Sequence, residues 1–327
     1  MNIVIIGGSG FIGSRLTTIL LSAGYRVKIA DKNDSYKYSH LRVYADVRKI
    51  ETLEGAFFGS DVVINLAAEH RDDVTPVSLY DDVNVDGAGN VCSVCTKLGI
   101  KKIIFTSSVA VYGFAPLGTD ETGKINYFND YGRTKWLAEE EYRKWLASDS
   151  DNSLTIIRPT VVFGEQNRGN VYNLLSQMAN GKFLMVGTGK NVKSMAYVEN
   201  VATFIMFNLN NDFGEYIYNY IDKPDFDMNA LVGEVNKTLK KTGKLIRLPY
   251  WIGYLGGLCF DLLGKIFRKK FSISSIRVKK FCSNSKFEVV NLKKTNFKAP
   301  VSLVEGLRRT IQYEFIDKIN ENVFYTE

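Results

Sequence analysis

The sequence predicts an α/β fold in which a doubly wound parallel sheet is joined to a smaller, mixed α/β domain. Over residues 1–165, short runs of Val, Ile and Leu alternate with amphipathic stretches, as expected for parallel strands covered by helices on both faces. After residue 165 this alternation becomes irregular. We therefore expect a first domain at 1–165 plus about 193–221, and a substrate-binding domain at about 166–192 and 222–327.

Five strands and three helices are predicted in the first domain. The strand-like runs are apolar on both faces and lie at Ile3–Ile6, Arg26–Ala30, Val62–Leu66, Ile103–Thr106 and Leu154–Ile157. Helical periodicity occupies about 11–23, 78–98 and 131–147. In such a sheet, ligands bind at the carboxyl ends of the strands, so the residues that follow the strands are the candidates for a site.

A glycine-rich turn, Gly7-Gly8-Ser9-Gly10-Phe11-Ile12-Gly13, joins the first strand to the first helix. Gly7 permits the tight turn, and Gly10 lets the backbone approach a pyrophosphate. Gly13 allows the helix to pack closely on the strand. The helix amino terminus, with Phe11 and Ile12, offers N–H groups and a positive dipole end to phosphates. The motif predicts a Rossmann-type dinucleotide site; a purely structural turn is the alternative.

Residues at the ends of the next strands extend the predicted cofactor site. Asp31 ends the second strand, 18 residues after Gly13. A carboxylate there accepts hydrogen bonds from the ribose hydroxyls and repels a 2′-phosphate, so it predicts NAD rather than NADP. The adenine edge is expected beside Asp46 and Val47, and the small residues of Leu66-Ala67-Ala68 leave room for the dinucleotide. Ordinary strand-end chemistry is the alternative at these two places.

Ser107-Ser108 and Tyr131-Gly132-Arg133-Thr134-Lys135 predict a hydride-transfer site. Tyr131 and Lys135 are one helical turn apart and share a helix face. The ammonium is therefore expected to lower the pKa of the phenol towards the working range. Ser108 follows an apolar strand whose end faces the ligand crevice. Neither of the two histidines, at 40 and 70, has the sequence context of a serine hydrolase, which excludes that class.

These motifs resemble the extended short-chain dehydrogenase/reductase superfamily, the NAD-dependent sugar epimerases and dehydratases. The resemblance implies that Ser108 hydrogen-bonds the reacting sugar oxygen and that Tyr131 transfers its proton. It also implies that Lys135 holds the nicotinamide ribose and lowers the pKa of Tyr131. Further positions matching the family's cofactor network are Asn84, Ser107 and Pro159. The superfamily usually dimerises through the helices corresponding to 78–98 and 131–147, so a homodimer is expected.

Four further blocks, at 69–74, 167–175, 193–198 and 274–282, resemble one branch of this superfamily. That branch comprises the bacterial 4-epimerases acting on N-acetylglucosamine linked through diphosphate to undecaprenol. Lys193 stands where nucleotide-sugar epimerases usually carry an arginine that grips the diphosphate, which argues against an ordinary UDP-sugar. Substrate contacts are expected from Glu69 and His70 at the sugar and from Arg168, Lys193 and Arg277 at the diphosphate. A loop histidine and solvated surface charges are the alternatives.

The formal net charge of +7 is concentrated in one segment. Between Lys237 and Lys280 there are twelve basic residues and one acid, Asp261, a net +11. Within this segment, 249–267 is the most apolar stretch of the chain, but its two charges and four glycines argue against a spanning helix. The basic, apolar segment 249–280 is predicted to contact an anionic membrane interface. A helix packed inside the substrate domain is the alternative.

Other features bound the location of the protein. Met1 leads directly into a strand without a basic region or a cleavage site, so no signal peptide is expected. Cys92 and Cys95 lie in a helical pattern with no second cysteine pair at zinc spacing, and are interpreted as buried thiols in a reducing cytoplasm. No metal and no nucleic-acid partner are expected.

Together, the resemblance implies an NAD-dependent 4-epimerase that interconverts N-acetylglucosamine and N-acetylgalactosamine on undecaprenyl diphosphate through a 4-keto intermediate. It would serve O-antigen, lipopolysaccharide or related glycans at the cytoplasmic face of the inner membrane. A soluble UDP-N-acetylhexosamine 4-epimerase and a nucleotide-sugar 4-keto reductase are the alternatives, because the Ser-Tyr-Lys set defines the chemistry and not the substrate. A non-catalytic dinucleotide sensor is a third, less favoured by an intact proton relay.

Overall fold

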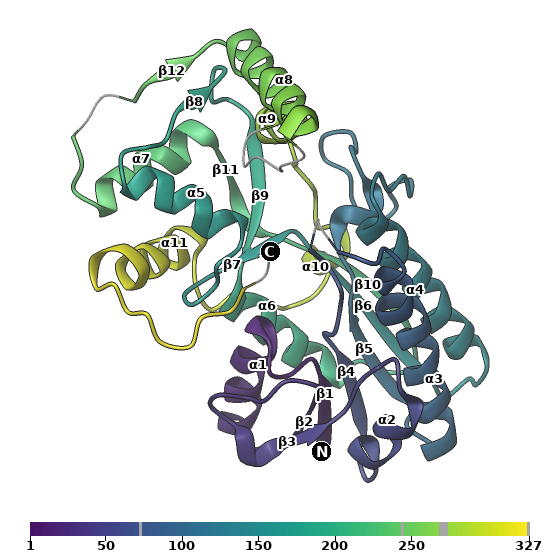
Figure 1. Cartoon of the computed structure of the whole chain (residues 1–327). Coiled ribbons are helices and arrows are strands. Elements are labelled where there is room, and N and C mark those ends of the chain that lie inside the picture. The colour runs from purple at the N-terminus through teal and green to yellow at the C-terminus, as the bar shows by residue number, and fades with distance from the viewer. Residues whose placement is uncertain (72–73, 243–244, 268–273, 326–327) are drawn as a thin grey trace.

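The computed structural model describes residues 1–327 except 72–73, 243–244, 268–273 and 326–327. Its main feature is a seven-stranded sheet of order β10-β6-β5-β4-β1-β2-β3, in which each neighbouring pair runs parallel (Figure 1). The strands are β1 (Asn2–Ile6), β2 (Arg26–Asp31), β3 (Arg42–Tyr44), β4 (Val62–Asn65), β5 (Lys102–Thr106), β6 (Ser153–Pro159) and β10 (Gly214–Tyr220). The predicted doubly wound α/β fold is confirmed.

Helices cover both faces of this sheet (Figure 1). One face carries α1 (Phe11–Ser22) and α6 (Val198–Phe207), and the other α2 (Ile50–Phe57), α3 (Gly87–Leu98) and α4 (Asp130–Ala147). Ile3 and Ile5 pack with the α1 and α6 side chains, whereas Val4 and Ile6 pack with those of α2, α3 and α4. Successive residues of a strand face opposite sides, so burial on both sides explains the continuous apolar runs.

Most predicted elements lie where the sequence places them. The predicted helix at 78–98 is divided, because a π-helical segment, Asp81–Asp86, precedes α3. The short β3 and α2 were not predicted. Cys92 and Cys95 are buried in α3, and burial raises the pKa of both thiols well above the usual range. The interpretation of these cysteines as buried thiols is confirmed.

The smaller part of the structure is built on the three-stranded sheet β11-β9-β7. Its strands are β7 (Val161–Phe163), β9 (Val192–Tyr197) and β11 (Asp222–Asp227), and its core is closed by α5 (Asn170–Ala179), α7 (Met228–Thr238) and α11 (Leu303–Ile311). A two-stranded pair joins β8 (Met185–Val186) to β12 (Arg247–Leu248). Of the range 193–221, predicted to lie with the first domain, β9 is part of this smaller sheet, whereas α6 and β10 belong to the larger one.

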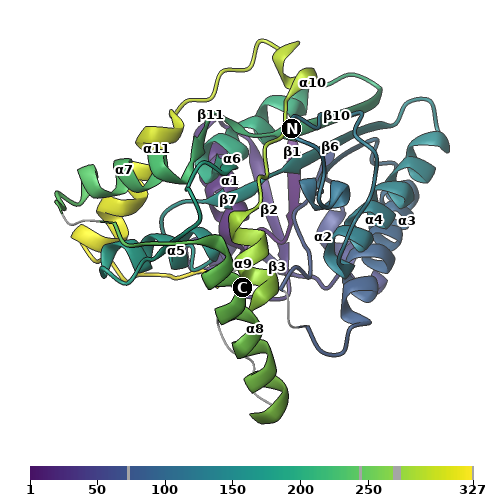
Figure 2. The ribbon, with the colours of Figure 1, turned by 90° about the horizontal axis from the view of Figure 1, so that it is seen from above.

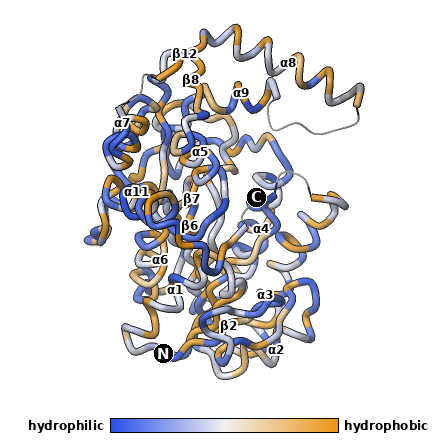
Figure 3. The backbone as a smooth tube through the Cα atoms, turned by 60° about the vertical axis from the view of Figure 1, so that its left-hand side comes forward, coloured by the Kyte–Doolittle hydropathy of each residue, from blue (hydrophilic) through white to orange (hydrophobic). Residues whose placement is uncertain are grey.

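Helix α8 (Tyr250–Phe267) projects beyond the rest of the molecule (Figure 2). It is held by α9 (Ser275–Cys282), since a Cβ on Gly257 would lie 2.7 Å from the Ser275 nitrogen. Figure 3 shows hydrophobic residues along its length. Trp251, Leu255 and Leu262 are 63%, 52% and 60% exposed, so α8 is not a core helix.

Among the residues that the structure describes, no helix is both long enough and apolar enough to cross a bilayer. The basic run at 268–270, which is part of the predicted membrane-facing segment, lies outside the described residues.

Candidate active site

The glycine turn between β1 and α1 leaves no room for a side chain at Gly7 or at Gly13. Gly7 has a φ of +73°, and a Cβ there would lie 2.8 Å from the Ala67 nitrogen. A Cβ on Gly13 would lie 2.5 Å from the Gly8 Cα. Gly10 is the N-cap residue of α1, and the helix starts at Phe11. This backbone cradle at a helix amino terminus fits a pyrophosphate.

Asp31 lies at the end of β2, next to the glycine turn. Its carboxylate accepts hydrogen bonds from the backbone nitrogens of Ser9 at 3.0 Å and Asn33 at 2.9 Å. These bonds hold the buried side chain at the carboxyl edge of the sheet, where a ribose would be bound. The placement fits the predicted role of Asp31.

The other predicted cofactor residues lie along the same edge. The Asp46 carboxylate is paired with Arg48 at 2.5 Å, which lowers the pKa of Asp46. Val47 packs against α3, because a Cβ on Gly87 would lie 2.8 Å from Val47 Cγ2. Leu66 and Ala67 follow β4, where the Leu66 nitrogen donates to the Ile6 carbonyl at 2.9 Å.

The predicted catalytic residues come together from β5 and α4. Asn129 caps α4 by accepting a hydrogen bond from the Gly132 nitrogen at 3.0 Å, and so positions Tyr131 in the first turn. Ser108 follows β5, where its Oγ atom accepts a hydrogen bond from the Ala110 nitrogen at 3.1 Å, and it lies close enough to Tyr131 to influence the pKa of the phenol. The Nζ atom of Lys135 donates to the Thr106 carbonyl at 2.8 Å and lies 4.7 Å from the centre of the Phe105 ring. The structure thus brings a serine hydroxyl, a phenol and a buried ammonium to one strand end.

Burial controls the protonation of these groups. It raises the pKa of Tyr131, and the nearby Ser108 hydroxyl opposes this rise. Burial lowers the pKa of Lys135 to about 7, and the carboxylate of Glu139 opposes this fall. The sequence predicts that Lys135 lowers the pKa of Tyr131. In the structure the ammonium is bonded to the Thr106 carbonyl, and this role of Lys135 stays a prediction.

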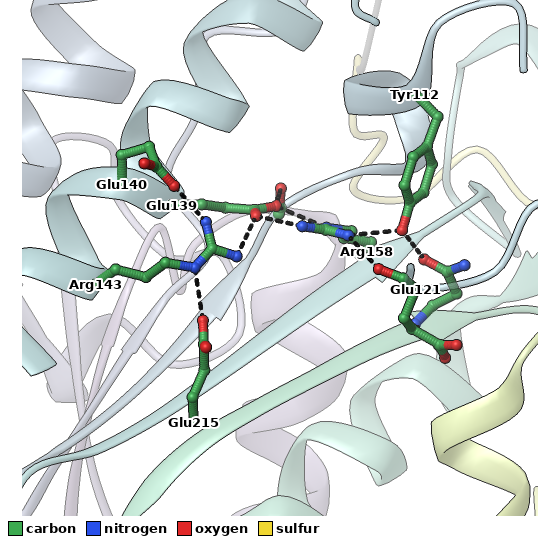
Figure 4. Close-up of polar contacts among 9 residues, drawn as sticks. Tyr112, Glu121, Glu139, Glu140, Arg143, Arg158 and Glu215 are labelled. Carbon is green, nitrogen blue, oxygen red and sulfur yellow. Dashed lines mark hydrogen bonds and ion pairs between the residues drawn. The ribbon is translucent and has the colours of Figure 1, made fainter. Parts of the chain in front are cut away.

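A buried polar network supports this site (Figure 4). The Arg158 guanidinium donates to Glu139 at 2.6 and 2.9 Å and to the Tyr112 hydroxyl at 2.6 Å. Ser107, next to Ser108, donates to Glu139 at 2.5 Å. Pro159 ends β6 immediately after Arg158. Sequence reasoning missed Glu139, although its spacing of four residues from Lys135 places it on the same helix face.

Asn84 connects the loop after β4 to α4. Its side-chain oxygen accepts from the Glu69 nitrogen at 2.9 Å, and its amide donates to the Glu69 carbonyl and to Thr134 Oγ1, each at 2.9 Å. The His70 ring lies edge-on to the Tyr131 ring, with 6.5 Å between the ring centres. His70 therefore lies beside the phenol of Tyr131, and Asn84 ties the Glu69 backbone to α4. The contact of Glu69 and His70 with a substrate stays a prediction.

The three predicted diphosphate ligands have different surroundings. Arg168 is paired with Glu314 at 2.6 Å. Lys193 donates to the carbonyls of Lys280 at 2.9 Å and Ser283 at 2.7 Å, and burial lowers its pKa to about 8. Arg277 lies on α9 and is exposed. Arg168 and Lys193 thus hold the C-terminal segments in place, and their contact with a substrate stays a prediction.

Comparisons with known proteins agree with this site. Residues 3–219, which include all residues of the Ser-Tyr-Lys set and the glycine turn, match the model of the NAD dependent epimerase/dehydratase family. The chain is 50% identical over 326 residues to the N-acetyl-alpha-D-glucosaminyl-diphospho-ditrans,octacis-undecaprenol 4-epimerase of Escherichia coli O157:H7, covering 99% of this chain and 98% of that one. It is 28% identical over 323 residues to the UDP-glucose 4-epimerase of Vibrio cholerae, covering 95% and 94%.

The fold is also found among solved structures. The UDP-glucose 4-epimerase of Thermus thermophilus in complex with NAD superposes with a TM-score of 0.75 at 21% identity, over 98% of this chain and 100% of that one. The cradle between β1 and α1, together with Asp31, fits the cofactor of this family, which is NAD. With the family match extending from β1 to β10, the chain belongs to the NAD-dependent epimerase/dehydratase family.

Proposed function

We propose that this protein is an NAD-dependent 4-epimerase that interconverts N-acetylglucosamine and N-acetylgalactosamine on undecaprenyl diphosphate, for O-antigen, lipopolysaccharide or related glycans. The observation that carries the proposal is the 50% identity, over nearly the full length of both chains, to the E. coli epimerase named for this lipid-linked sugar. The neighbouring Ser108 and Tyr131 support it, because a 4-epimerase needs an acid-base group at the sugar oxygen.

Each residue of the site has its own role in the proposed reaction. Tyr131, as the phenolate, takes the proton of the sugar 4-hydroxyl, and Ser108 donates a hydrogen bond to the oxygen as it becomes a carbonyl. Bound NAD supplies a reversible hydride acceptor and donor at C4. Tyr131 returns the proton to the oxygen when C4 is reduced on its opposite face, so the reaction has no net oxidation. Lys135, whose ammonium donates to the Thr106 carbonyl, is proposed to hold the nicotinamide ribose.

Product analysis tests this function. The purified protein is incubated with undecaprenyl-diphosphate N-acetylglucosamine and, separately, with UDP-N-acetylglucosamine. Formation of the galacto product from the lipid-linked sugar is expected. Turnover of the nucleotide sugar alone would instead support a UDP-sugar 4-epimerase, which the similarity to the V. cholerae enzyme favours as the second candidate. Stoichiometric oxidation of NADH would indicate a reductase, and no turnover of either sugar would indicate a dinucleotide sensor.

Peripheral contact with the cytoplasmic face of the inner membrane is part of the proposal. On α8, exposed apolar side chains recur with spacings of four, three and four residues, which places them on one helix face. They are Trp251, Leu255, Leu258 and Leu262. The surrounding segment carries the +11 charge excess. An apolar helix face beside basic residues is typical of binding to anionic lipid.

Vesicle co-sedimentation tests this contact. The Leu255→Gln/Leu262→Gln variant is expected to bind vesicles of anionic phospholipid about ten-fold less tightly than wild type, because it removes two apolar side chains from the face. Phe213→Gln is the control, since Phe213 is a large apolar residue that is 66% exposed but lies before β10. Equal binding of both variants would contradict a role of α8 at the membrane. A change from dimer to monomer in the α8 variant would instead assign its face to a second copy of the chain.

We also propose a homodimer through α3 and α4, the helices that correspond to the usual dimer interface of the superfamily. Sedimentation equilibrium of wild type and of the α8 variant tests it. A concentration-independent monomer mass for wild type would contradict it.

A further inference from the structure

An exposed aromatic pair lies beside the catalytic helix. Phe114 follows η3 (Val109–Tyr112), which begins after Ser108, and Phe128 is three residues before Tyr131. The two rings are 4.7 Å apart between their centres and inclined by 40°. Their side chains are 49% and 45% exposed, although paired phenylalanines usually pack inside a protein.

Two lysines of α9 lie over these rings. Lys279 Nζ is 5.9 Å from the centre of the Phe114 ring, and Lys280 Nζ is 4.9 Å from the centre of the Phe128 ring. The aromatic pair comes from the NAD-binding part of the chain and the ammonium groups from the C-terminal part. Two apolar rings and two cations are therefore placed side by side at the border between them.

The loop that carries the pair is fixed in place. A Cβ on Gly113 would lie 2.0 Å from the Asn126 carbonyl oxygen, so the two arms of the loop lie against each other. The Gly118 nitrogen donates to the Lys286 carbonyl at 2.9 Å, and Thr119 forms a β-bridge with Phe287. The exposure of the rings is thus a property of an anchored loop and not of a free one.

This combination fits an amphipathic ligand that carries an anionic group next to an apolar chain. Exposed Leu117 and Tyr127 extend the apolar surface of the same loop. Phenylalanine rings bind apolar chains because the contact removes apolar surface from water. Lysine ammonium groups bind phosphate oxygens. The position next to Tyr131 suits the part of a substrate that follows the reacting sugar.

We propose that Phe114, Phe128, Lys279 and Lys280 form the binding site for the polyprenyl diphosphate part of the substrate. The lysines bind the diphosphate, and the first isoprene units pack on the two rings. The exposed face of α8, which is joined to α9, continues the apolar path towards the membrane. This inference rests on the proposed function, since only a lipid-linked sugar has such a chain.

Steady-state kinetics with two substrates test it. One is undecaprenyl-diphosphate N-acetylglucosamine, and the other carries the same sugar diphosphate on a short, water-soluble alkyl chain. The Phe114→Ala/Leu117→Ala variant is expected to raise the KM for the undecaprenyl substrate about ten-fold, because it removes apolar contact area. The KM for the short substrate should change less than about two-fold. Phe213→Ala, at an exposed phenylalanine outside the site, is the control and should change neither.

The lysines are tested with one variant that removes both charges and one that retains them. Lys279→Met/Lys280→Met is expected to raise the KM for both substrates about ten-fold, since both carry the diphosphate, and Lys279→Arg/Lys280→Arg should restore most of the affinity. An unchanged KM in the aromatic and lysine variants, or an equal rise for both substrates in the aromatic variant, would overturn the inference while leaving the proposed function intact. Failure of wild type to convert any lipid-linked sugar would instead overturn the proposed function.

Discussion

Glu139 and Arg158 form a buried ion pair in which Arg158 Nη2 and Glu139 Oε2 are 2.6 Å apart and the side chains are 0% and 2% exposed. Glu139 lies two helical turns after Tyr131 and one turn after Lys135, on the same face of α4. Arg158 belongs to the adjacent strand β6, and Ser107 donates to the same carboxylate. The pair therefore fixes α4, which carries Tyr131 and Lys135, against the strand ends that carry Ser107 and Ser108.

Replacing Glu139 with Gln is expected to lower the free energy of unfolding by about 3–5 kcal/mol, because Arg158 is left as a buried charge without a counterion. Urea unfolding of the variant measures this change. Glu140→Gln is the control on the same helix, where the carboxylate pairs with the partly exposed Arg143 at 2.6 Å. That change is expected to cost at most about 1 kcal/mol. Equal losses in the two variants would argue against a special role of the buried pair.

The pKa of Lys135 predicts a pH dependence of stability. Burial lowers this pKa to about 7, from about 10.4 in an unfolded chain. Between these values the unfolded state binds more protons than the folded state, so the contribution of Lys135 to stability increases with pH, by up to about 1.4 kcal/mol per pH unit. The cost of burying the group is fully present below pH 7.

Urea unfolding from pH 7 to pH 10, with NAD removed, compares wild type with Lys135→Met. The difference in unfolding free energy, wild type minus variant, should increase with pH in this window, because the variant has no titrating group at this position. A difference that stays constant would show that the ammonium is not displaced from its ordinary pKa.

Tyr131→Phe is expected to reduce turnover by about 10²–10⁴-fold, because the variant loses the group proposed to transfer the proton of the sugar hydroxyl. The NAD content of the purified protein should remain that of wild type. Tyr142→Phe is the matched control. Tyr142 also belongs to α4, but it is buried in the hydrophobic core, where its hydroxyl accepts a hydrogen bond from the Asn65 amide at 2.6 Å. Near-normal turnover of Tyr131→Phe would show that another group transfers the proton.

Features that depend on neighbouring residues could be predicted from the sequence. The glycine turn and the i, i+4 spacing of Tyr131 and Lys135 are local patterns, and the structure places them as expected. Partners distant in the chain could not be predicted. Arg168 was expected at the diphosphate, but its carboxylate partner, Glu314, is 146 residues away in sequence. The carbonyl partners of Lys193 are 87 and 90 residues away. A charged side chain gives no local signal of such a tertiary contact.

Gly13 and Gly55 provide a test of the close approach between α1 and β1. Both lie inside helices, but a Cβ on Gly13 would lie 2.5 Å from the Gly8 Cα, whereas a Cβ on Gly55 would meet none of the described residues within 4 Å. Gly55→Ala is expected to increase the unfolding free energy by about 0.5–1 kcal/mol, because alanine has the higher helix propensity.

Gly13→Ala brings the same gain in helix propensity, but its Cβ can be accommodated only if the backbone shifts. The unfolding free energy is therefore expected to decrease by about 1–3 kcal/mol. The displaced turn should also bind NAD more weakly, which the NAD content of the purified variant measures. Because the two variants make the same chemical change in two helices, the difference between them reports the space at the glycine turn. If Gly13→Ala matched Gly55→Ala in stability and retained its NAD, the close packing of α1 on the turn would not be required for the cofactor site.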